Sequence, residues 1–219
     1  MARNTTFSFE FYPPQTQEGV TKLMQTAKEL NEYNPEFFSV TFGAGGSTKE
    51  KTLETVLDLK KSGFNATPHI SCISSSKAEI KDLLDIYKSN KINHLVALRG
   101  DNPSGSINFG ELNYANELVS FIKSEMGDTF KIDVGAYPEV HPESETAKQD
   151  FINFKNKVEA GADSAITQFF YNVDAYFKFV DECQKNSINI PIVPGIMPIY
   201  NSKQLIRFAN NCGAEIPRW

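Results

Sequence analysis

The sequence has few of the residues that mark secreted, disulfide-bonded and metal-binding proteins. Its 219 residues include only three cysteines, Cys72, Cys183 and Cys212, which are far apart and form no Cys-x-x-Cys pair. An odd number of widely spaced cysteines indicates free thiols in a reducing compartment, and we therefore expect a cytoplasmic protein. The three histidines show no metal-ligand spacing either, so we expect no metal site.

Long hydrophobic runs and basic runs are also missing from the sequence. No apolar stretch approaches the ~20 residues that a membrane-spanning helix needs, and the net charge is −5. These features argue against a membrane or a nucleic acid as partner, and they leave small molecules as the expected ligands. Residues 1–6 lead directly into a predicted strand, so we expect no signal peptide.

Strand and helix patterns alternate seven times along the chain. The helix patterns show apolar residues every three or four positions, as at Val20, Leu23, Ala27 and Leu30. We expect the helices to be capped by Ser47 and Ser202 where they follow these residues. The expected strands are 6–11, 37–41, 65–70, 94–98, 131–136, 164–168 and 191–196. The expected helices are 17–34, the stretch between Ser47 and Gly63, 77–90, 114–126, 145–160, 173–186 and 203–211.

Regular alternation of this kind predicts one α/β domain over residues 1–219, with a parallel sheet. Seven units favour a (β/α)8 TIM-type barrel whose eighth strand–helix unit is missing from this chain. An open, doubly wound sheet is the alternative, but such a sheet usually has Gly-x-Gly-x-x-Gly after its first strand. This chain has Tyr12-Pro13-Pro14 there instead.

Nearly every expected strand ends in one or more polar side chains, whereas the strand starts carry no comparable set. In α/β folds, ligands bind at the carboxyl ends of parallel strands. The pattern therefore predicts one shared site at this end of the sheet. The polar residues at the strand ends are Glu10, Thr41, His69, Arg99, Asp101, Tyr137, Glu139, His141 and Gln168.

Glu10 is the sharpest single candidate for catalysis, because it stands between Phe9 and Phe11 in an aromatic strand. An apolar pocket favours the neutral form of a carboxyl group, which suits the group to donate a proton. Like-charge repulsion from Asp101 would favour the neutral form further. The alternative is a structural ion pair, for example with Arg99.

Other strand-end segments suit a flat, polar ligand. Residues 99–101, Arg-Gly-Asp, form either a surface ion pair or one wall of a site. Residues 137–142 form either a rigid ligand-binding loop or a stiff turn, and they carry a phenol, a carboxylate and an imidazole. Gln168 offers an amide beside two phenylalanines. Asp150, Asn153 and Lys157 make one stripe on the helix that follows, and such a stripe is usually a solvated face.

Two reaction classes are disfavoured by missing residues. No predicted strand ends in lysine, which argues against a Schiff-base aldolase. No Gly-x-Ser-x-Gly elbow is present, which argues against an α/β-hydrolase. The residues alone therefore predict a barrel that has an acidic side chain on its first strand and a surface suited to a flat ligand.

Five motifs run in order over essentially the whole chain. They are Phe9-Glu10-Phe11-Tyr12-Pro13-Pro14, Ser39-Val40-Thr41-Phe42-Gly43-Ala44, Ala97-Leu98-Arg99-Gly100-Asp101, Ala136-Tyr137-Pro138-Glu139-Val140-His141-Pro142 and Ile166-Thr167-Gln168-Phe169-Phe170. Taken together, they resemble the motifs of the bacterial type of 5,10-methylenetetrahydrofolate reductase. The resemblance implies a flavin-containing barrel that uses FAD to pass a hydride from NADH or NADPH to the folate. The product would be 5-methyltetrahydrofolate, which feeds one-carbon metabolism and methionine synthesis.

The resemblance also implies a role for individual residues. It makes Glu10 the general acid that opens the folate ring, and Asp101 the group that stabilises the resulting cation. It places Gln168 and Gln204 at the folate and implies that Lys157 pairs with a phosphate of FAD. A homo-oligomer is implied as well. The residues that resemble FAD contacts are Thr41, Phe42, Ala44, His69, Arg99, Gly100, Asp101, Tyr114, Ala115, Tyr137, His141, Asp150, Asn153 and Lys157.

One departure from the family pattern keeps two alternatives open. The family's domain continues past Trp219 through an eighth strand, so the chain resembles a C-terminally truncated member. The first alternative is a catalytically silent fragment that binds flavin or folate. The second is a flavin barrel that acts on another substrate, such as proline.

Overall fold

The computed structural model describes residues 5–42, 46–100 and 110–217. It divides the chain into two compact units, Met1–Lys131 (unit 1) and Ile132–Trp219 (unit 2).

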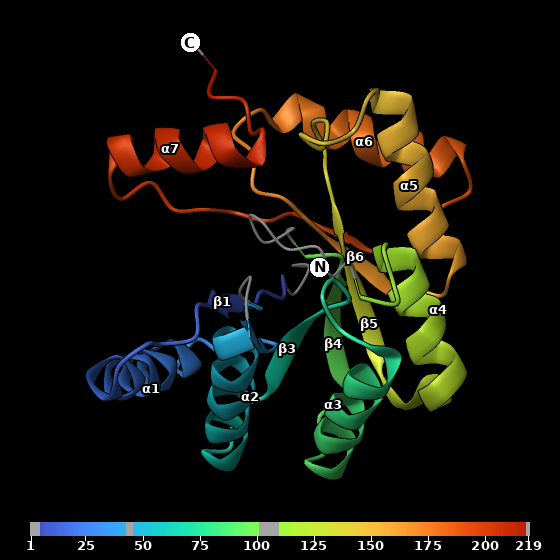
Figure 1. Cartoon of the computed structure of the whole chain (residues 1–219). Coiled ribbons are helices and arrows are strands. Elements are labelled where there is room, and N and C mark those ends of the chain that lie inside the picture. Colours follow the sequence, from blue (N-terminus) through green and yellow to red (C-terminus); the bar gives the residue numbers. More distant parts are fainter. Residues whose placement is uncertain (1–4, 43–45, 101–109, 218–219) are drawn as a thin grey trace. The chain divides into compact units, whose positions relative to one another are not determined.

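Unit 1 contains four parallel strands, and a helix follows each of them (Figure 1). The strands pair in sequence order, β1 with β2, β2 with β3 and β3 with β4. The strands are β1 (Phe9–Phe11), β2 (Phe38–Val40), β3 (Ala66–Ser71) and β4 (His94–Leu98). The helices are α1 (Gln17–Asn31), α2 (Gly46–Lys61), α3 (Lys77–Ser89) and α4 (Ala115–Met126), and the 3-10 turn η1 (Gly127–Thr129) follows α4.

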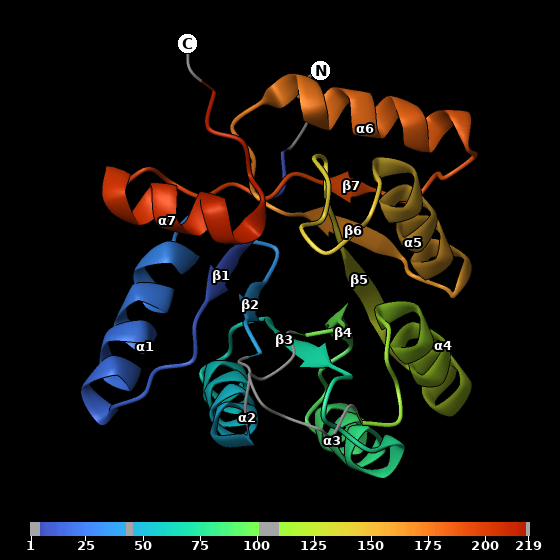
Figure 2. The same cartoon turned by 45° about the horizontal axis from the view of Figure 1, so that its top comes forward.

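Alternation along β1, β2 and β3 gives this part of the sheet of unit 1 an apolar face and a polar face. Phe38 packs edge-on against Phe64, which joins α2 to β3, with ring centroids 5.6 Å apart. Its burial contributes about 2 kcal/mol. The next residue, Ser39, points to the opposite face, where the strand register places it between Glu10 and Thr67. In Figure 2 the helices of unit 1 lie around the outside of its strands, and α2 packs on β2 and β3.

Unit 2 continues the alternation with three parallel strands and three helices. The pairs are β5 with β6 and β6 with β7. Figure 2 shows α5 and α6 along one side of these strands, and α7 packs through Ala209 on Phe169 and Ala214. The strands are β5 (Lys131–Ala136), β6 (Ser164–Thr167) and β7 (Ile192–Val193), and the helices are α5 (Ala147–Glu159), α6 (Val173–Lys185) and α7 (Ser202–Cys212).

The predicted α/β alternation is confirmed, and its seven strand–helix units are those of a TIM-type barrel that lacks the last unit within the described residues. β4 and β5 have the predicted bounds. Two cap predictions are wrong. α2 begins at Gly46, so Ser47 lies inside the helix. Asn201 caps α7, because its side chain accepts hydrogen bonds from the backbone N–H groups of Lys203 (3.0 Å) and Gln204 (3.2 Å).

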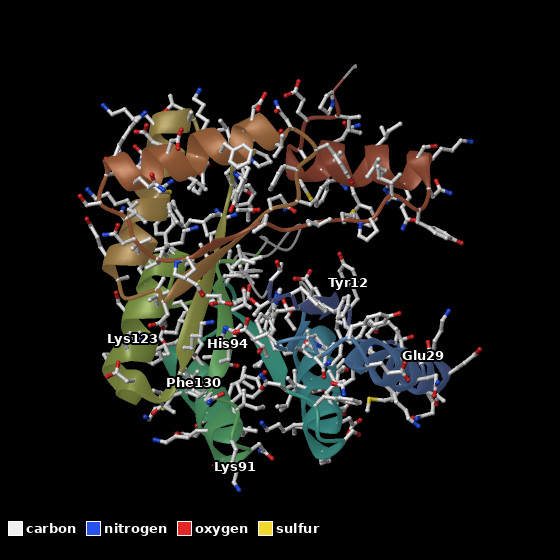
Figure 3. The ribbon with its side chains drawn as sticks, turned by 180° about the vertical axis from the view of Figure 1, so that it is seen from behind. Tyr12, Glu29, Lys91, His94, Lys123 and Phe130 are labelled. Carbon is white, nitrogen blue, oxygen red and sulfur yellow. The ribbon has the colours of Figure 1, made fainter. Side chains whose placement is uncertain are left out.

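Parallel strands bring their carboxyl ends to one edge of a unit. In Figure 3, Tyr12, which directly follows β1, stands at one end of unit 1, and Lys91, which precedes β4, stands at the opposite end. The residues at the carboxyl ends of β2, β3 and β4 therefore belong to the end that Tyr12 marks.

Candidate active site

The polar face of unit 1 carries buried polar atoms that have no partner. Glu10, Ser39 and Thr67 are neighbours across β1, β2 and β3. His69 is two residues beyond Thr67, so its side chain lies on the same face, one step nearer the carboxyl end. Both Thr67 and His69 are buried, yet Thr67 Oγ1 and His69 Nε2 make no hydrogen bond to any described residue. Such atoms are uncommon and point to a ligand or an ordered water.

The structure brings Glu10 together with His69, rather than with the Arg99 that the sequence suggested. Glu10 Oε2 lies 3.4 Å from His69 Nε2. The Glu10 side chain is 49% exposed, whereas the His69 side chain is only 8% exposed. The Arg99 side chain donates from Nε to the backbone oxygen of Gly100, 3.2 Å away. The predicted acid therefore has a fixed imidazole as its neighbour.

The charge state of Glu10 differs from the one predicted for a carboxyl group in an apolar pocket. Partial burial raises the pKa of Glu10, but the nearby N–H and positive charge of His69 lower it by more. The net pKa is therefore below its usual value, and Glu10 is a carboxylate at neutral pH. The aromatic neighbours Phe9 and Phe11 do not enclose it, because they point to the other face of the strand.

The end of β4 is held tightly by the segment that follows β3. The backbone oxygen of Arg99 accepts hydrogen bonds from Ser71 Oγ (2.6 Å) and from the backbone N–H of Ile73 (3.0 Å). Gly100 has a φ of +87°, and a Cβ there would overlap Ser71 Oγ. Glycine is therefore required at this position by both conformation and space.

The remaining predicted residues of unit 1 lie at the ends of elements. Thr41–Phe42 follow β2 and are half-buried. Tyr114 is 59% exposed and precedes Ala115, the first residue of α4. Ala44 and Asp101 lie outside the described residues, so their predicted roles stay predictions.

In unit 2, Asp150 fixes the loop that follows β5. Its carboxylate accepts hydrogen bonds from the backbone N–H of His141 and from Ser144 Oγ, both at 3.0 Å. The rings of Tyr137 and His141 meet edge to face, with centroids 4.4 Å apart. Asp150 therefore stabilises the conformation of this loop through these two hydrogen bonds.

Glu139 connects the same loop to the segment that follows α7. Its Oε2 accepts a hydrogen bond from the backbone N–H of Glu215, 3.0 Å away. Burial raises the pKa of Glu139; this hydrogen bond opposes the rise and the charge of Glu215 adds to it, so the net pKa is raised. In this structure Glu139 therefore binds the backbone of the segment that follows α7.

Lys157 is turned into unit 2, which differs from the solvated stripe that its helix position suggests. Its Nζ donates to the backbone oxygen of Gly135 in β5 and lies 5.7 Å from the ring centroid of Phe154. Burial lowers the pKa of Lys157 to about 8, and the charge of Asp150 opposes this shift. Asn153, one turn earlier, is exposed. Lys157 is therefore a partly desolvated cation.

The two glutamines predicted to bind folate are held differently. Gln168 is half-buried after β6, and its Oε1 accepts a hydrogen bond from the backbone N–H of Phe169, 3.0 Å away. Gln204 is exposed in the first turn of α7. Within the described part of unit 2, no hydrogen bond joins their side chains.

Two residues of the polar face escaped the sequence reasoning. Thr67 and Ser71 flank His69 at alternate positions of β3, and both are buried. The two-residue period of a strand would have placed all three on one face. The strand-end prediction considered only the polar residue at the end of this strand, which is His69, and so it missed the other two.

Two kinds of feature are absent from the described residues. They contain no group of three or more His, Cys, Asp or Glu side chains that could bind a metal ion together. None of their helices combines the length and the apolarity that crossing a bilayer requires.

Comparison with known proteins supplies the family. The family model described as methylenetetrahydrofolate reductase matches residues 1–219. The chain belongs to the methylenetetrahydrofolate reductase family. Curated relatives named 5,10-methylenetetrahydrofolate reductase, from Buchnera aphidicola subsp. Schizaphis graminum and Escherichia coli (strain K12), are 45% and 43% identical to it. Each alignment covers 97% of this chain, and 72% and 71% of the respective relative.

Solved structures support the barrel architecture of this reductase-family chain. A Clostridium thermocellum protein that binds two copies of 5-methyl-5,6,7,8-tetrahydrofolic acid matches with a TM-score of 0.63 at 16% identity, covering 98% of this chain and 73% of that protein. The 3-dehydroquinate dehydratase from Geobacillus kaustophilus matches with a TM-score of 0.56 at 12% identity, covering 90% of this chain and 75% of that enzyme. At these identities the likeness concerns the fold alone.

Proposed function

We propose that this chain reduces 5,10-methylenetetrahydrofolate to 5-methyltetrahydrofolate, with FAD as cofactor and NADH or NADPH as hydride donor. The product would feed one-carbon metabolism and methionine synthesis. The observation that carries the proposal is the Glu10–His69 pair on the polar face of unit 1, in a chain of the reductase family. Residues 1–219 would act as a single flavin-binding α/β barrel domain. A cytoplasmic location and a homo-oligomeric state stay predictions.

Several described residues suit a flavin. Lys157 offers a partly desolvated cation for a phosphate. Gly100 lets the backbone after β4 pack directly against Ser71, which fixes the strand end where the ligand would bind. The unpaired atoms of Thr67 and His69 offer hydrogen bonds to a polar ligand edge. The proposed FAD contacts are Thr41, Phe42, Ala44, His69, Arg99, Gly100, Asp101, Tyr114 and Ala115 of unit 1, and Tyr137, His141, Asp150, Asn153 and Lys157 of unit 2.

The chemistry assigned to this chain's own residues is mainly acid catalysis and positioning. FAD, when bound, supplies hydride transfer between the nicotinamide and the folate. Glu10 would donate a proton to the folate nitrogen that leaves when the five-membered ring opens. Asp101, outside the described residues, would stabilise the cation formed on the folate. Gln168 and Gln204 would hold the folate in place.

Glu10→Gln tests this assignment by separating the two half-reactions. Purified protein should be yellow and should lose its colour with NADH, and methylenetetrahydrofolate should restore the colour. We expect Glu10→Gln to keep the first step nearly unchanged and to slow the second, because only the folate needs a proton. Stopped-flow absorbance of the flavin measures both steps. Glu36→Gln is the matched control. Glu36 is an exposed glutamate that forms an ion pair with Lys131 at 3.9 Å, away from the polar face, so its loss should change neither half-reaction.

The possible outcomes separate the alternatives. Protein that is colourless and cannot be reconstituted with FAD contradicts the proposal. A flavin that bleaches with NADH, but is not reoxidised by methylenetetrahydrofolate, indicates a binding chain without the folate step. Reoxidation by a different compound, such as a proline-derived imine, indicates another substrate. Equal losses in both half-reactions of Glu10→Gln would refute the acid role of Glu10.

A further inference from the structure

We propose that His69 is a positioning residue for Glu10, fixing its carboxyl group on the polar face of unit 1. This inference rests on the proposed function, in which Glu10 is the acid of folate ring opening. It assigns His69 a role in positioning Glu10, in addition to its proposed contact with the flavin.

The first argument is the contrast in burial between the two side chains. His69 is 8% exposed at its side chain and is held in β3, whereas the Glu10 side chain is 49% exposed. A half-exposed glutamate has several accessible rotamers, and ordering it costs side-chain entropy. The 3.4 Å contact with a buried ring therefore selects one position of the carboxylate. The ring itself has little freedom to follow.

The second argument is the path that the Glu10 side chain takes across the sheet. β1 and β3 are not neighbours, since β2 lies between them. Two strand spacings amount to about 9.6 Å. The residue of β2 that occupies the register between Glu10 and Thr67 is Ser39, which is small and buried. A larger side chain there would stand between Glu10 and His69, so the sheet is built to let this pair meet.

The third argument is that His69 Nε2 makes no hydrogen bond to any described residue, while Glu10 Oε2 lies 3.4 Å from it. Desolvating a ring nitrogen without pairing it costs free energy. A polar group that approaches the carboxylate would satisfy Nε2 as well. The imidazole is thus directed at Glu10 and at whatever binds beside it.

The electrostatic effect of His69 acts on proton donation by Glu10 in two opposite ways. Burial raises the pKa of Glu10, and His69 lowers it by more. Within the described parts of β1, β2 and β3, His69 is the only titratable group found to act on Glu10, since Ser39 and Thr41 are uncharged. The interaction with His69 stabilises the carboxylate that remains once the proton has left. It thereby makes Glu10 a stronger acid, while fewer Glu10 groups are protonated beforehand.

The proton step balances without any further reactant. The proton leaves the Glu10 carboxyl group and binds the folate nitrogen. The C–N bond of the five-membered ring breaks, and its electron pair stays on that nitrogen. The carbon becomes the cationic end of an iminium group, and Glu10 is left as a carboxylate beside His69. Solvent returns the proton to Glu10 after the folate has been released.

The test compares the pH profiles of the two half-reactions in the wild type and in His69→Gln. We expect the pH at which the folate half-reaction is half-maximal to move upward in His69→Gln, with a lower maximal rate. The NADH half-reaction should keep the pH of its half-maximal rate, whatever change in rate the loss of His69 as a proposed FAD contact causes. In a Glu10→Gln background, His69→Gln should have no further effect on the folate half-reaction. His94→Gln is the matched control, because His94 begins β4 and packs on Phe37 at 4.6 Å.

A second readout does not depend on catalysis. The side-chain carboxyl carbon of Glu10, followed by 13C NMR in the chain without folate, should titrate at lower pH in the wild type than in His69→Gln. If the wild type fails to reduce folate while this difference is present, the proposed function fails and the pairing stands. An unchanged Glu10 titration in folded His69→Gln overturns the inference. Equal shifts of both half-reaction profiles also overturn it, because they would place His69 at the flavin alone. If His69→Gln does not fold, the wild-type titration decides, since a Glu10 midpoint at or above that of a model glutamate overturns the pairing.

Discussion

Lys157 provides a prediction in which the sign and the size both come from the structure. Its amine donates to the backbone oxygen of Gly135, and burial lowers its pKa to about 8 against the opposing charge of Asp150. The protonated amine would bind a phosphate of FAD more tightly than the neutral amine. Above pH 8, FAD must therefore compete with deprotonation of Lys157.

The expected loss of affinity follows from a single titrating proton. If only the protonated amine binds, the apparent Kd grows by a factor of 1 + 10^(pH − 8), which is about 1.1 at pH 7 and about 11 at pH 9. FAD affinity should thus fall about tenfold between these two pH values. Lys157→Met should bind more weakly at pH 7 and should show no such slope.

In the flavin-free protein, Lys157 should make the free energy of unfolding rise with pH, whereas FAD affinity should fall with pH. The pKa of Lys157 is below its ordinary value of 10.5, so the folded chain binds fewer protons than the unfolded chain between about pH 8 and that value. Its free energy of unfolding should therefore rise with pH through this window. Bound FAD should weaken this rise, because a phosphate holds the proton on Lys157.

The assay is a titration of the flavin-free chain with FAD, followed by flavin fluorescence at pH 7, 8 and 9. Lys155→Met is the matched control, because Lys155 lies on the same helix and pairs with Glu159 at 3.7 Å. It should retain the wild-type slope. The reasoning is refuted by a wild-type affinity that is flat between pH 7 and pH 9, or by a Lys157→Met variant that keeps the slope.

Two further predictions concern stability. Tyr87→Phe should stabilise the chain by about 1–3 kcal/mol in urea unfolding, because the Tyr87 hydroxyl is buried without a partner among the described residues. Tyr176→Phe should instead cost about 1 kcal/mol, because its hydroxyl donates to the Ile192 backbone oxygen at 2.8 Å; destabilisation by both variants contradicts this reasoning. Asn201→Ala should lower the thermal midpoint at a cost of about 1 kcal/mol. Ser202→Ala should change the free energy of unfolding by about 0.5 kcal/mol or less. A larger loss in Ser202→Ala than in Asn201→Ala would show that Ser202 is the cap.

Local patterns in the sequence are enough for the order and type of the elements. The alternation of two-residue and 3.6-residue periods depends on neighbouring residues only, and it predicted seven strand–helix units. β4 and β5 have the expected bounds. Strand ends were less accurate: the expected strand 191–196 shrinks to Ile192–Val193, since hydrogen bonding to β6 covers only these residues.

The sequence by itself determined the α/β class, the family motifs and Glu10 as a candidate acid. Only the tertiary structure decided the partner of Glu10 and the environment of Lys157. Glu10 meets His69 because register across β2 brings together residues that are far apart in the chain. Lys157 turns inward because β5 offers it a backbone carbonyl. Charge states depend on such long-range neighbours, and a one-dimensional pattern does not contain them.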